Sequence, residues 1–296
     1  MANKNQGRRG RGSRDRTPVM PSPAELPRLV ATDLDGTLLR RDGSISARTL
    51  RALKGARAAG IELVMVTGRP ARHVAKIEGL AELGGTVICV NGALIYDLDR
   101  ELVVHEERLS AINACELVQE LRSRLPGICF AVEVGLEYGW EPGYALQRKR
   151  ADLPRLPIVD ALTLCARGVN KLIARHPHFS AEELIERSHD LFVERARVSY
   201  SGAPILEISA AAVSKGSALA VYCSARRIER SRVLSFGDMP NDLPMLEWTG
   251  HSVAMGNAHP SVIAAAHEVT LSNEEDGVAT VVERLLSDQG RVDAEP

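Results

Sequence analysis

The chain has 296 residues, which is long enough for two folded domains, and its composition excludes several classes of protein. Hydrophobic residues make up 45% of the chain and charged residues 25%, which argues against general disorder. The formal net charge is -1, so the chain as a whole lacks the positive charge that attracts nucleic acid. The five cysteines are scattered and form no CxxC pair. This spacing argues against a disulfide framework or a structural zinc site, and it predicts reduced thiols in a cytoplasmic protein.

Residues 1–26 differ in composition from the rest of the chain. They hold six basic residues among glycine, serine and proline, with no apolar segment, and so predict a disordered tail and no signal peptide. A phosphate-binding arm is the alternative for such a polybasic segment, although nucleic acid is not the expected partner of the whole protein. Residues 289–296 are expected to form a second flexible tail. No stretch approaches the roughly 20 apolar residues needed to span a bilayer, so no membrane partner is expected.

A strand, a helix and a second strand are predicted at the start of the folded part. Residues 29–32 form a short apolar run that stops at the polar segment Asp33-Leu34-Asp35-Gly36. Ser46 can cap a helix that is expected to reach Arg57. Residues 61–66 are apolar again, and this strand-helix-strand unit predicts parallel pairing.

The same pattern then repeats. The second strand ends in Thr67-Gly68, a helix is expected near 72–80, and a third strand over 86–90 ends at Asn91. Polar residues therefore follow the carboxyl ends of three successive strands.

The pattern of predicted helices and strands changes near Tyr96. A long amphipathic helix is followed by alternating strands, and a second helix opens with a capping box at Ser180. We interpret 96–203 as an inserted α+β domain. Its predicted elements are a helix over 111–125, strands over 128–134, 136–140 and 169–174, a helix over 180–191, and strands over 197–200 and 205–208.

Strand-helix alternation returns after Ser214-Lys215-Gly216. Residues 27–95 and 204–288 are therefore expected to form one discontinuous core. Its later elements are predicted as a helix to 225, a strand over 233–236, the loop 237–242, a strand over 253–255, a helix over 260–266, a strand over 269–271 and a helix over 277–286.

Asp33 and Asp35 stand two residues apart at the end of a predicted strand. Because Gly36 can bend the chain, both carboxylates can reach one site. One can attack phosphorus, since an acyl phosphate is labile enough for water to cleave, while the other moves protons. A simple turn is the alternative reading of the isolated motif.

Further polar residues follow later strands. Asp238 and Asp242 flank Asn241 in a loop, and carboxylate oxygens are what a hard divalent ion such as magnesium selects. Helix capping is the alternative role for Asn241 or Asp242, but it leaves Asp238 unexplained. Thr67 can donate its hydroxyl to a phosphate at a helix start. Lys215 can neutralise the charge gathered there, although a lone lysine at a helix start is usually a solvated side chain.

The motifs Asp-Leu-Asp-Gly-Thr-Leu, Thr-Gly-Arg, Ser-Lys-Gly and Gly-Asp-Met-Pro-Asn-Asp occur in this order, each at a strand end or helix start. Together they strongly resemble the Cof-type branch of the haloacid dehalogenase-like hydrolases, over about Leu29 to Leu286. The resemblance implies an α/β fold, with a Rossmann-like, doubly wound parallel-sheet core. A mobile cap of the class IIB type would be inserted between the Thr67 and Lys215 motifs.

The resemblance also implies a role for each motif residue. Asp33 would be the nucleophile and Asp35 the general acid and base. The phosphoryl group would be held by Thr67, Gly68, Asn91 and Lys215, with Asn241 positioning Lys215 or phosphate. Mg²⁺ would be coordinated by Asp33, Asp238, Asp242 and the backbone carbonyl of Asp35.

These roles predict a magnesium-dependent phosphatase that acts on a small phosphorylated metabolite, such as a sugar phosphate or a phosphorylated cofactor or its precursor. Two alternatives stay open: a sugar phosphomutase-type phosphotransferase, and a non-catalytic binding or regulatory protein on the same fold. In the cap, the basic run Gln147–Arg150 is expected to be a solvated face. Trp140 and Tyr144 are expected to be buried rather than to stack on a substrate.

Overall fold

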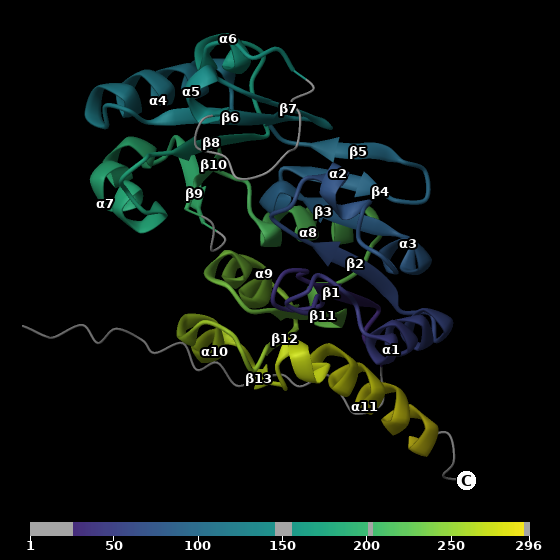
Figure 1. Cartoon of the computed structure of the whole chain (residues 1–296). Coiled ribbons are helices and arrows are strands. Elements are labelled where there is room, and N and C mark those ends of the chain that lie inside the picture. The colour runs from purple at the N-terminus through teal and green to yellow at the C-terminus, as the bar shows by residue number, and fades with distance from the viewer. Residues whose placement is uncertain (1–25, 146–155, 201–203, 293–296) are drawn as a thin grey trace, which may run out of the picture.

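The computed structural model describes residues 26–145, 156–200 and 204–292, and it divides them into a core and a smaller cap (Figure 1). The cap lies above the core in Figure 1, and it is an insertion in the core. Most of the tail expected over 1–26, the basic run Gln147–Arg150 and the last four residues of the tail expected over 289–296 lie outside the described residues.

The core is built on an eight-stranded sheet with the order β13-β12-β11-β1-β2-β3-β4-β5. Neighbours from β13 to β3 pair in parallel, whereas β4 and β5 add two antiparallel strands at one edge. The sheet confirms the predicted α/β class. Its strands are β1 (Leu29–Thr32), β2 (Glu62–Val66), β3 (Thr86–Cys89), β4 (Leu94–Asp97), β5 (Leu102–Glu106), β11 (Val233–Gly237), β12 (His251–Ala254) and β13 (Glu268–Val269).

Helices cover both faces of the core sheet. Val30 points into an apolar cluster with α1 and α11, whereas its neighbour Ala31 points into a second cluster with α8 and α9. Successive residues of a strand face opposite sides of a sheet, so the apolar run of β1 fills two separate cores. The core helices are α1 (Ala47–Ala58), α2 (Ala71–Val74), α3 (Leu80–Leu83), α8 (Lys215–Ala225), α9 (Leu243–Trp248), α10 (Pro260–Ala265) and α11 (Gly277–Val292).

The cap is built on a five-stranded antiparallel sheet with the order β7-β6-β8-β10-β9. One face, with Phe130, Leu172 and Ile208, packs against α4, α6 and α7 and forms an apolar core of its own. The alternate residues of the same strands point away from these helices. The cap elements are α4 (Ala111–Arg124), β6 (Cys129–Val134), β7 (Glu137–Trp140), α5 (Pro142–Ala145), α6 (Ala161–Cys165), β8 (Lys171–Arg175), α7 (Ala181–Phe192), β9 (Ala196–Ser199) and β10 (Leu206–Ala210).

The limits of the insertion differ from the expected 96–203. The strands β4 and β5 continue the core sheet as far as Glu106, and β10 belongs to the cap sheet rather than to the core. The cause is strand pairing, because β4 pairs with β3, and β10 pairs with β8 and β9. A local sequence pattern does not encode which sheet a strand will join. The limit at 96 falls inside β4, and the limit at 203 leaves β10 outside the insertion, although the strand predicted over 205–208 is grouped with the inserted elements.

Two helices also differ from the prediction. The helix expected near 72–80 is two short helices, α2 and α3, with Gly79 at a φ of 81° in front of the second. The helix expected to end at Leu286 continues to Val292, so residues 289–292 are helical and not part of a tail.

Other expectations hold. Trp140 and Tyr144 are 5% and 3% exposed and belong to a buried aromatic cluster of the cap. The five cysteines are free thiols. Within the three described ranges, no helix combines the length and the apolar character needed to cross a bilayer.

Candidate active site

The carboxyl end of β1 carries the centre of the site. This strand lies between β11 and β2, and the amide of Asp33 extends the ladder by donating to the carbonyl of Phe236 at 3.1 Å. The Asp33 side chain is buried. Lys215 Nζ donates to Asp33 Oδ1 at 2.5 Å and to Asp242 Oδ1 at 2.6 Å. The ammonium therefore bridges carboxylates that come from opposite ends of the chain.

The loop after β11 turns two aspartates toward Asp33. Asp242 Oδ2 accepts hydrogen bonds from the amides of Asp238 at 3.0 Å and Met239 at 2.9 Å, which fixes the 3-10 turn η3 (Pro240–Asp242). One oxygen of Asp242 thus shapes its own loop while the other faces Lys215. Asp242 stands at the N-cap position of the helix over Leu243–Trp248, but its side chain makes no capping hydrogen bond to that helix.

The turn after Asp33 packs closely on this loop. Thr37 Oγ1 donates to Asp238 Oδ1 at 2.8 Å. Gly36 has a φ of 80°, and a Cβ atom added there would lie 2.3 Å from Asp238 Oδ2. Any larger residue at position 36 would displace the Asp238 carboxylate, so glycine is required by both conformation and space.

The cluster holds three carboxylates and one ammonium, that of Lys215, so negative charge is in excess. Burial raises the pKa of Asp33 well above its ordinary value, and Lys215 opposes that shift. Burial and the charge of Asp242 raise the pKa of Asp238 to about 6. Burial alone would lower the pKa of Lys215, but the carboxylates of Asp242 and Asp33 outweigh it and raise that pKa, so the lysine is charged at neutral pH.

This acidic cluster can hold a metal ion. Asp33, Asp238 and Asp242 each offer a carboxylate oxygen, and the three oxygens lie within 4.8 Å of one another. A divalent cation would balance the excess negative charge that otherwise favours protonation, and the all-oxygen donor set fits a hard ion. The side chain of Asp35 stands outside this cluster. The expected role of its backbone carbonyl as a ligand stays a prediction.

Asp35 has a different environment from Asp33. Its side chain is 54% exposed, and Arg69 holds both of its oxygens, with Nε 2.7 Å from Oδ2 and Nη2 in contact with Oδ1. The planar guanidinium fork fixes the orientation of the carboxylate. Asp33 and Asp35 are two positions apart and have different environments. Asp33 is buried and binds a lysine, whereas Asp35 is exposed and binds an arginine.

The remaining motif residues meet beside these carboxylates. Thr67 is fully buried, and its Oγ1 accepts a hydrogen bond from the amide of Arg69 at 3.1 Å. Asn91 adopts a left-handed conformation with a φ of 57°, and its amide donates to the carbonyl of Thr67 at 3.0 Å. Asn241 Nδ2 donates to Asn91 Oδ1 at 3.2 Å, so the contact recorded for Asn241 is with Asn91 rather than with Lys215.

Two cap residues that the motifs did not include lie against the same segments. Lys171 Nζ donates to the carbonyl of Gly68 at 2.9 Å, and Glu207 Oε2 accepts from Asn91 Nδ2 at 2.9 Å. Lys171 Nζ also lies 2.5 Å from Glu207 Oε1. Glu207 is the only charged residue in its strand, and Lys171 begins the apolar run Leu172-Ile173-Ala174, so a charge beside buried apolar residues is the signal by which each can be noticed in the sequence. Their meeting depends on the pairing of β8 with β10.

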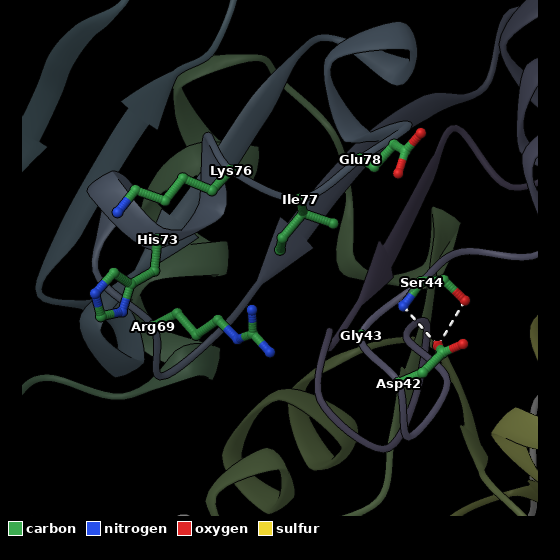
Figure 2. A pocket seen from close by; sticks show the side chains of 8 residues that line it. All are labelled: Asp42, Gly43, Ser44, Arg69, His73, Lys76, Ile77 and Glu78. Atoms are coloured by element: carbon green, nitrogen blue, oxygen red, sulfur yellow. Dashed lines mark hydrogen bonds between the residues drawn. The ribbon is translucent and has the colours of Figure 1, made fainter. Parts of the chain in front are cut away.

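A cleft of about 420 Å³ lies next to Arg69, the residue that holds the Asp35 carboxylate (Figure 2). One wall is the segment after β2, and the opposite wall is the loop after β1, which includes Asp42 and Ser44. Arg69 lines the cleft and also holds Asp35. The full lining is Asp42, Gly43, Ser44, Arg69, His73, Lys76, Ile77 and Glu78.

A smaller cavity of about 160 Å³ is lined by Lys215 and lies between the core and the cap. Its core wall includes Lys215, Asn91 and Asn241, and its cap wall includes Arg197 and Ser199. Two cavities are therefore lined by residues of the site, and one of them lies between the core and the cap.

Comparisons with known proteins point in the same direction as the geometry. A family model described as haloacid dehalogenase-like hydrolase matches residues 30–282. The pyridoxal phosphate phosphatase YbhA of Escherichia coli strain K12 is 30% identical over 271 residues, which cover 86% of this chain and 97% of that protein. The 5-amino-6-(5-phospho-D-ribitylamino)uracil phosphatase YwtE of Bacillus subtilis strain 168 is 30% identical over 285 residues, which cover 88% of this chain and 98% of that protein.

A solved structure shares the whole fold. The subclass IIB sugar phosphatase BT4131 matches with a TM-score of 0.72 at 22% sequence identity, and the match covers 87% of this chain and 98% of that one. Because the match extends over nearly all of that chain, it includes the inserted cap as well as the core.

Proposed function

This chain is a phosphatase of the haloacid dehalogenase-like hydrolase family, in its Cof-type branch, and we propose that it hydrolyses small phosphorylated metabolites through an aspartyl phosphate on Asp33. The observation that carries the proposal is the cluster of Asp33, Asp238 and Asp242, in which the Lys215 ammonium bridges Asp33 and Asp242. A buried nucleophile needs positive charge around it before it can approach an anionic phosphoester.

We expect the acidic cluster to bind Mg²⁺ through Asp33, Asp238 and Asp242. When bound, the ion supplies positive charge that reduces the repulsion between the Asp33 carboxylate and the phosphoester. Lys215 contributes a second positive charge through its contacts with the two carboxylates that it bridges, Asp33 and Asp242.

The first step transfers the phosphoryl group to the protein. An Asp33 oxygen attacks phosphorus, and the bond to the leaving oxygen breaks while Asp35 gives that oxygen a proton. In the second step Asp35 takes a proton from water as the water oxygen attacks phosphorus. The bond to Asp33 then breaks, which restores its carboxylate and releases inorganic phosphate. Arg69 orients Asp35 for both proton transfers.

The leaving group is proposed to lie in the cleft of Figure 2. A proton donor must touch the leaving oxygen, and Arg69 joins the Asp35 carboxylate to this cleft. Basic side chains on one wall and acidic or hydroxyl side chains on the other suit a polar leaving group with several hydrogen-bonding positions. Sugar phosphates and phosphorylated cofactors or their precursors have this character.

The decisive experiment is phosphate release from p-nitrophenyl phosphate and from a panel of phosphorylated sugars and cofactors, with and without magnesium. We expect release that requires magnesium and that disappears in Asp33→Asn, because an amide cannot accept the phosphoryl group. Undiminished turnover in a folded Asp33→Asn variant would rule out the proposed nucleophile. Interconversion of sugar phosphate isomers without net phosphate release would instead identify a phosphotransferase.

A further inference from the structure

One face of the cap sheet carries buried charges opposite the motif residues of the core. The other face of these strands packs on the cap helices, so the alternate residues Glu133, Lys171 and Glu207 point away from that apolar core. Lys171 is 3% exposed and Glu207 is 6% exposed. Charged side chains are almost never buried to this extent unless each has a partner.

The partners of Lys171 and Glu207 join the cap to the core. Each residue pairs with the other at 2.5 Å, and each also makes a hydrogen bond of 2.9 Å to a core residue. Lys171 bonds the carbonyl of Gly68, and Glu207 bonds the side chain of Asn91. These core residues directly follow β2 and β3, at the edge of the sheet where Asp33 lies.

Asn91 is the residue that depends most on the cap. Its left-handed backbone conformation is uncommon for a residue with a side chain, and it needs surrounding contacts to hold it. Glu207 and Ser199 from the cap accept both of its amide protons, Ser199 at 3.2 Å, while Asn241 donates to its oxygen. Asn91 is therefore fixed between two cap strands and the loop that carries the metal-binding aspartates.

The position of Gly68 is linked to that of Asn91. A Cβ atom at Gly68 would lie 2.9 Å from Asn91 Oδ1, so the two residues are in close contact. A shift of Asn91 therefore disturbs the segment that follows Thr67. Lys171 holds this segment from its other side through the Gly68 carbonyl.

We propose that Lys171 and Glu207 are positioning residues, which complete the phosphate-binding arrangement of Gly68 and Asn91 when the cap contacts the core. This inference rests on the proposed function. The pair acts through the core residues that it holds. The geometry of the site therefore depends on whether the cap contacts the core. This dependence matters for catalysis because a misplacement of a substrate-binding group by about 1 Å can lower the rate about 100-fold.

Glu133 provides a matched control. It is 4% exposed, lies on the same face of the cap sheet, and makes a buried ion pair with Arg72 of the core, with a contact of 2.8 Å between Arg72 Nη2 and Glu133 Oε1. In the described structure it has no recorded hydrogen bond to Gly68 or Asn91. Glu133→Gln therefore removes a buried link between core and cap without touching the motif segments.

The test compares kcat, KM and melting temperature of Glu207→Gln, Lys171→Gln and Glu133→Gln, with p-nitrophenyl phosphate and magnesium. We expect kcat to fall about 10- to 100-fold in each of the first two variants, with KM changed less than about threefold, because positioning acts mainly on the transition state. In Glu133→Gln we expect a lower melting temperature but a kcat within about threefold of wild type. The double variant Lys171→Gln/Glu207→Gln should lose no more than about twofold beyond the worse single variant.

Two outcomes would overturn the inference. One is an unchanged kcat in folded Glu207→Gln or, if that variant does not fold, in Lys171→Gln. The other is an equal loss of kcat in Glu133→Gln, since that would reflect any broken link between core and cap. A wild-type protein without phosphatase activity would contradict the proposed function instead. Binding of orthovanadate, which mimics the five-coordinate phosphorus of the transition state, still tests the pair in that case when it is measured by calorimetry, because affinity should fall in Glu207→Gln and not in Glu133→Gln.

Discussion

Lys215 and Asp33 form a fully buried ion pair, with Nζ 2.5 Å from Oδ1 and the lysine side chain 2% exposed. The same ammonium reaches Asp242, so a single lysine neutralises two of the three clustered carboxylates. Lys215 is therefore tied to both the attacking group and the metal-binding loop. Its removal should affect stability as well as catalysis.

Lys215→Met should destabilise the metal-free protein by about 3–5 kcal/mol, because it leaves buried carboxylates without their cation. Magnesium should restore part of this loss by supplying positive charge, while turnover should stay at least about 100-fold below wild type. Chemical denaturation with and without magnesium measures the effect. As a control, Lys54→Met removes an exposed pair with Glu82 and should change stability by less than about 1 kcal/mol. Equal stability of Lys215→Met and wild type would contradict the prediction.

Asp35→Asn should separate the two chemical steps. With an alkyl phosphate both steps need proton transfer, so turnover should fall by about 100- to 10,000-fold. The p-nitrophenolate ion leaves without a proton, so the first step should survive with p-nitrophenyl phosphate. Rapid mixing should then show a burst of about one equivalent of p-nitrophenol, followed by slow turnover. The absence of a burst, with wild type fully active, would count against Asp35 as the base that activates water in the second step.

Metal affinity should depend on pH through Asp238. The pKa of this carboxyl is raised from 3.8 to about 6 by burial first and by the charge of Asp242 second. Because the folded-state value is the higher one, the carboxyl stabilises the metal-free fold most below about pH 3.8, and this contribution is lost as the pH rises through about 6. Magnesium binding requires the ionised form, so affinity should fall as the pH drops below about 6.

The melting temperature measures this linkage directly. The rise caused by a fixed magnesium concentration should be larger at about pH 7.5 than at about pH 5, because the stabilisation by a ligand follows its affinity. Asp238→Asn should remove most of the rise at the higher pH. A magnesium effect of the same size at both pH values would be inconsistent with this assignment.

The cleft of Figure 2 should influence which substrates are preferred. Lys76 and Glu78 line it, so a leaving group that carries a second anionic group should interact favourably with Lys76 and unfavourably with Glu78. Lys76→Ala should raise KM for such substrates by about 3- to 10-fold, as expected for one partly exposed charge contact, with little change for neutral sugar phosphates. Glu78→Ala is the matched variant and should lower the same KM. Identical KM values in both variants for every substrate would place the leaving group elsewhere.

The sequence predicted several elements of the core and the cap well because their signals are local. The apolar run of β1 followed by Asp33, the capping of α1 by Ser46 and the capping box of α7 can each be found within a few neighbouring residues, and each is present in the structure. The convergence of Asp33 with Asp238 could also be anticipated, because both follow strands and parallel strands direct their carboxyl ends to one edge of the sheet.

The limits of the cap could not be found in this way. The residues of β4 and β10 do not say which sheet each strand joins, and only their hydrogen-bonded partners assign β4 to the core and β10 to the cap. The break of the helix expected near 72–80 was also missed. Gly79 is a permissive residue, and its left-handed conformation depends on the tertiary packing of Leu50 against it.

The sequence by itself determined the class of fold, the family and the set of acidic and basic residues from which a phosphatase site is built, because these depend on residue type, order and local pattern. Only the tertiary structure decided which partner each charge has. It pairs Asp33 with Lys215, Asp35 with Arg69, and the cap residues Lys171 and Glu207 with each other across the motif segments of the core. The physical reason is that a buried charge must find a partner, and the partner is chosen by strand pairing and burial rather than by distance along the chain.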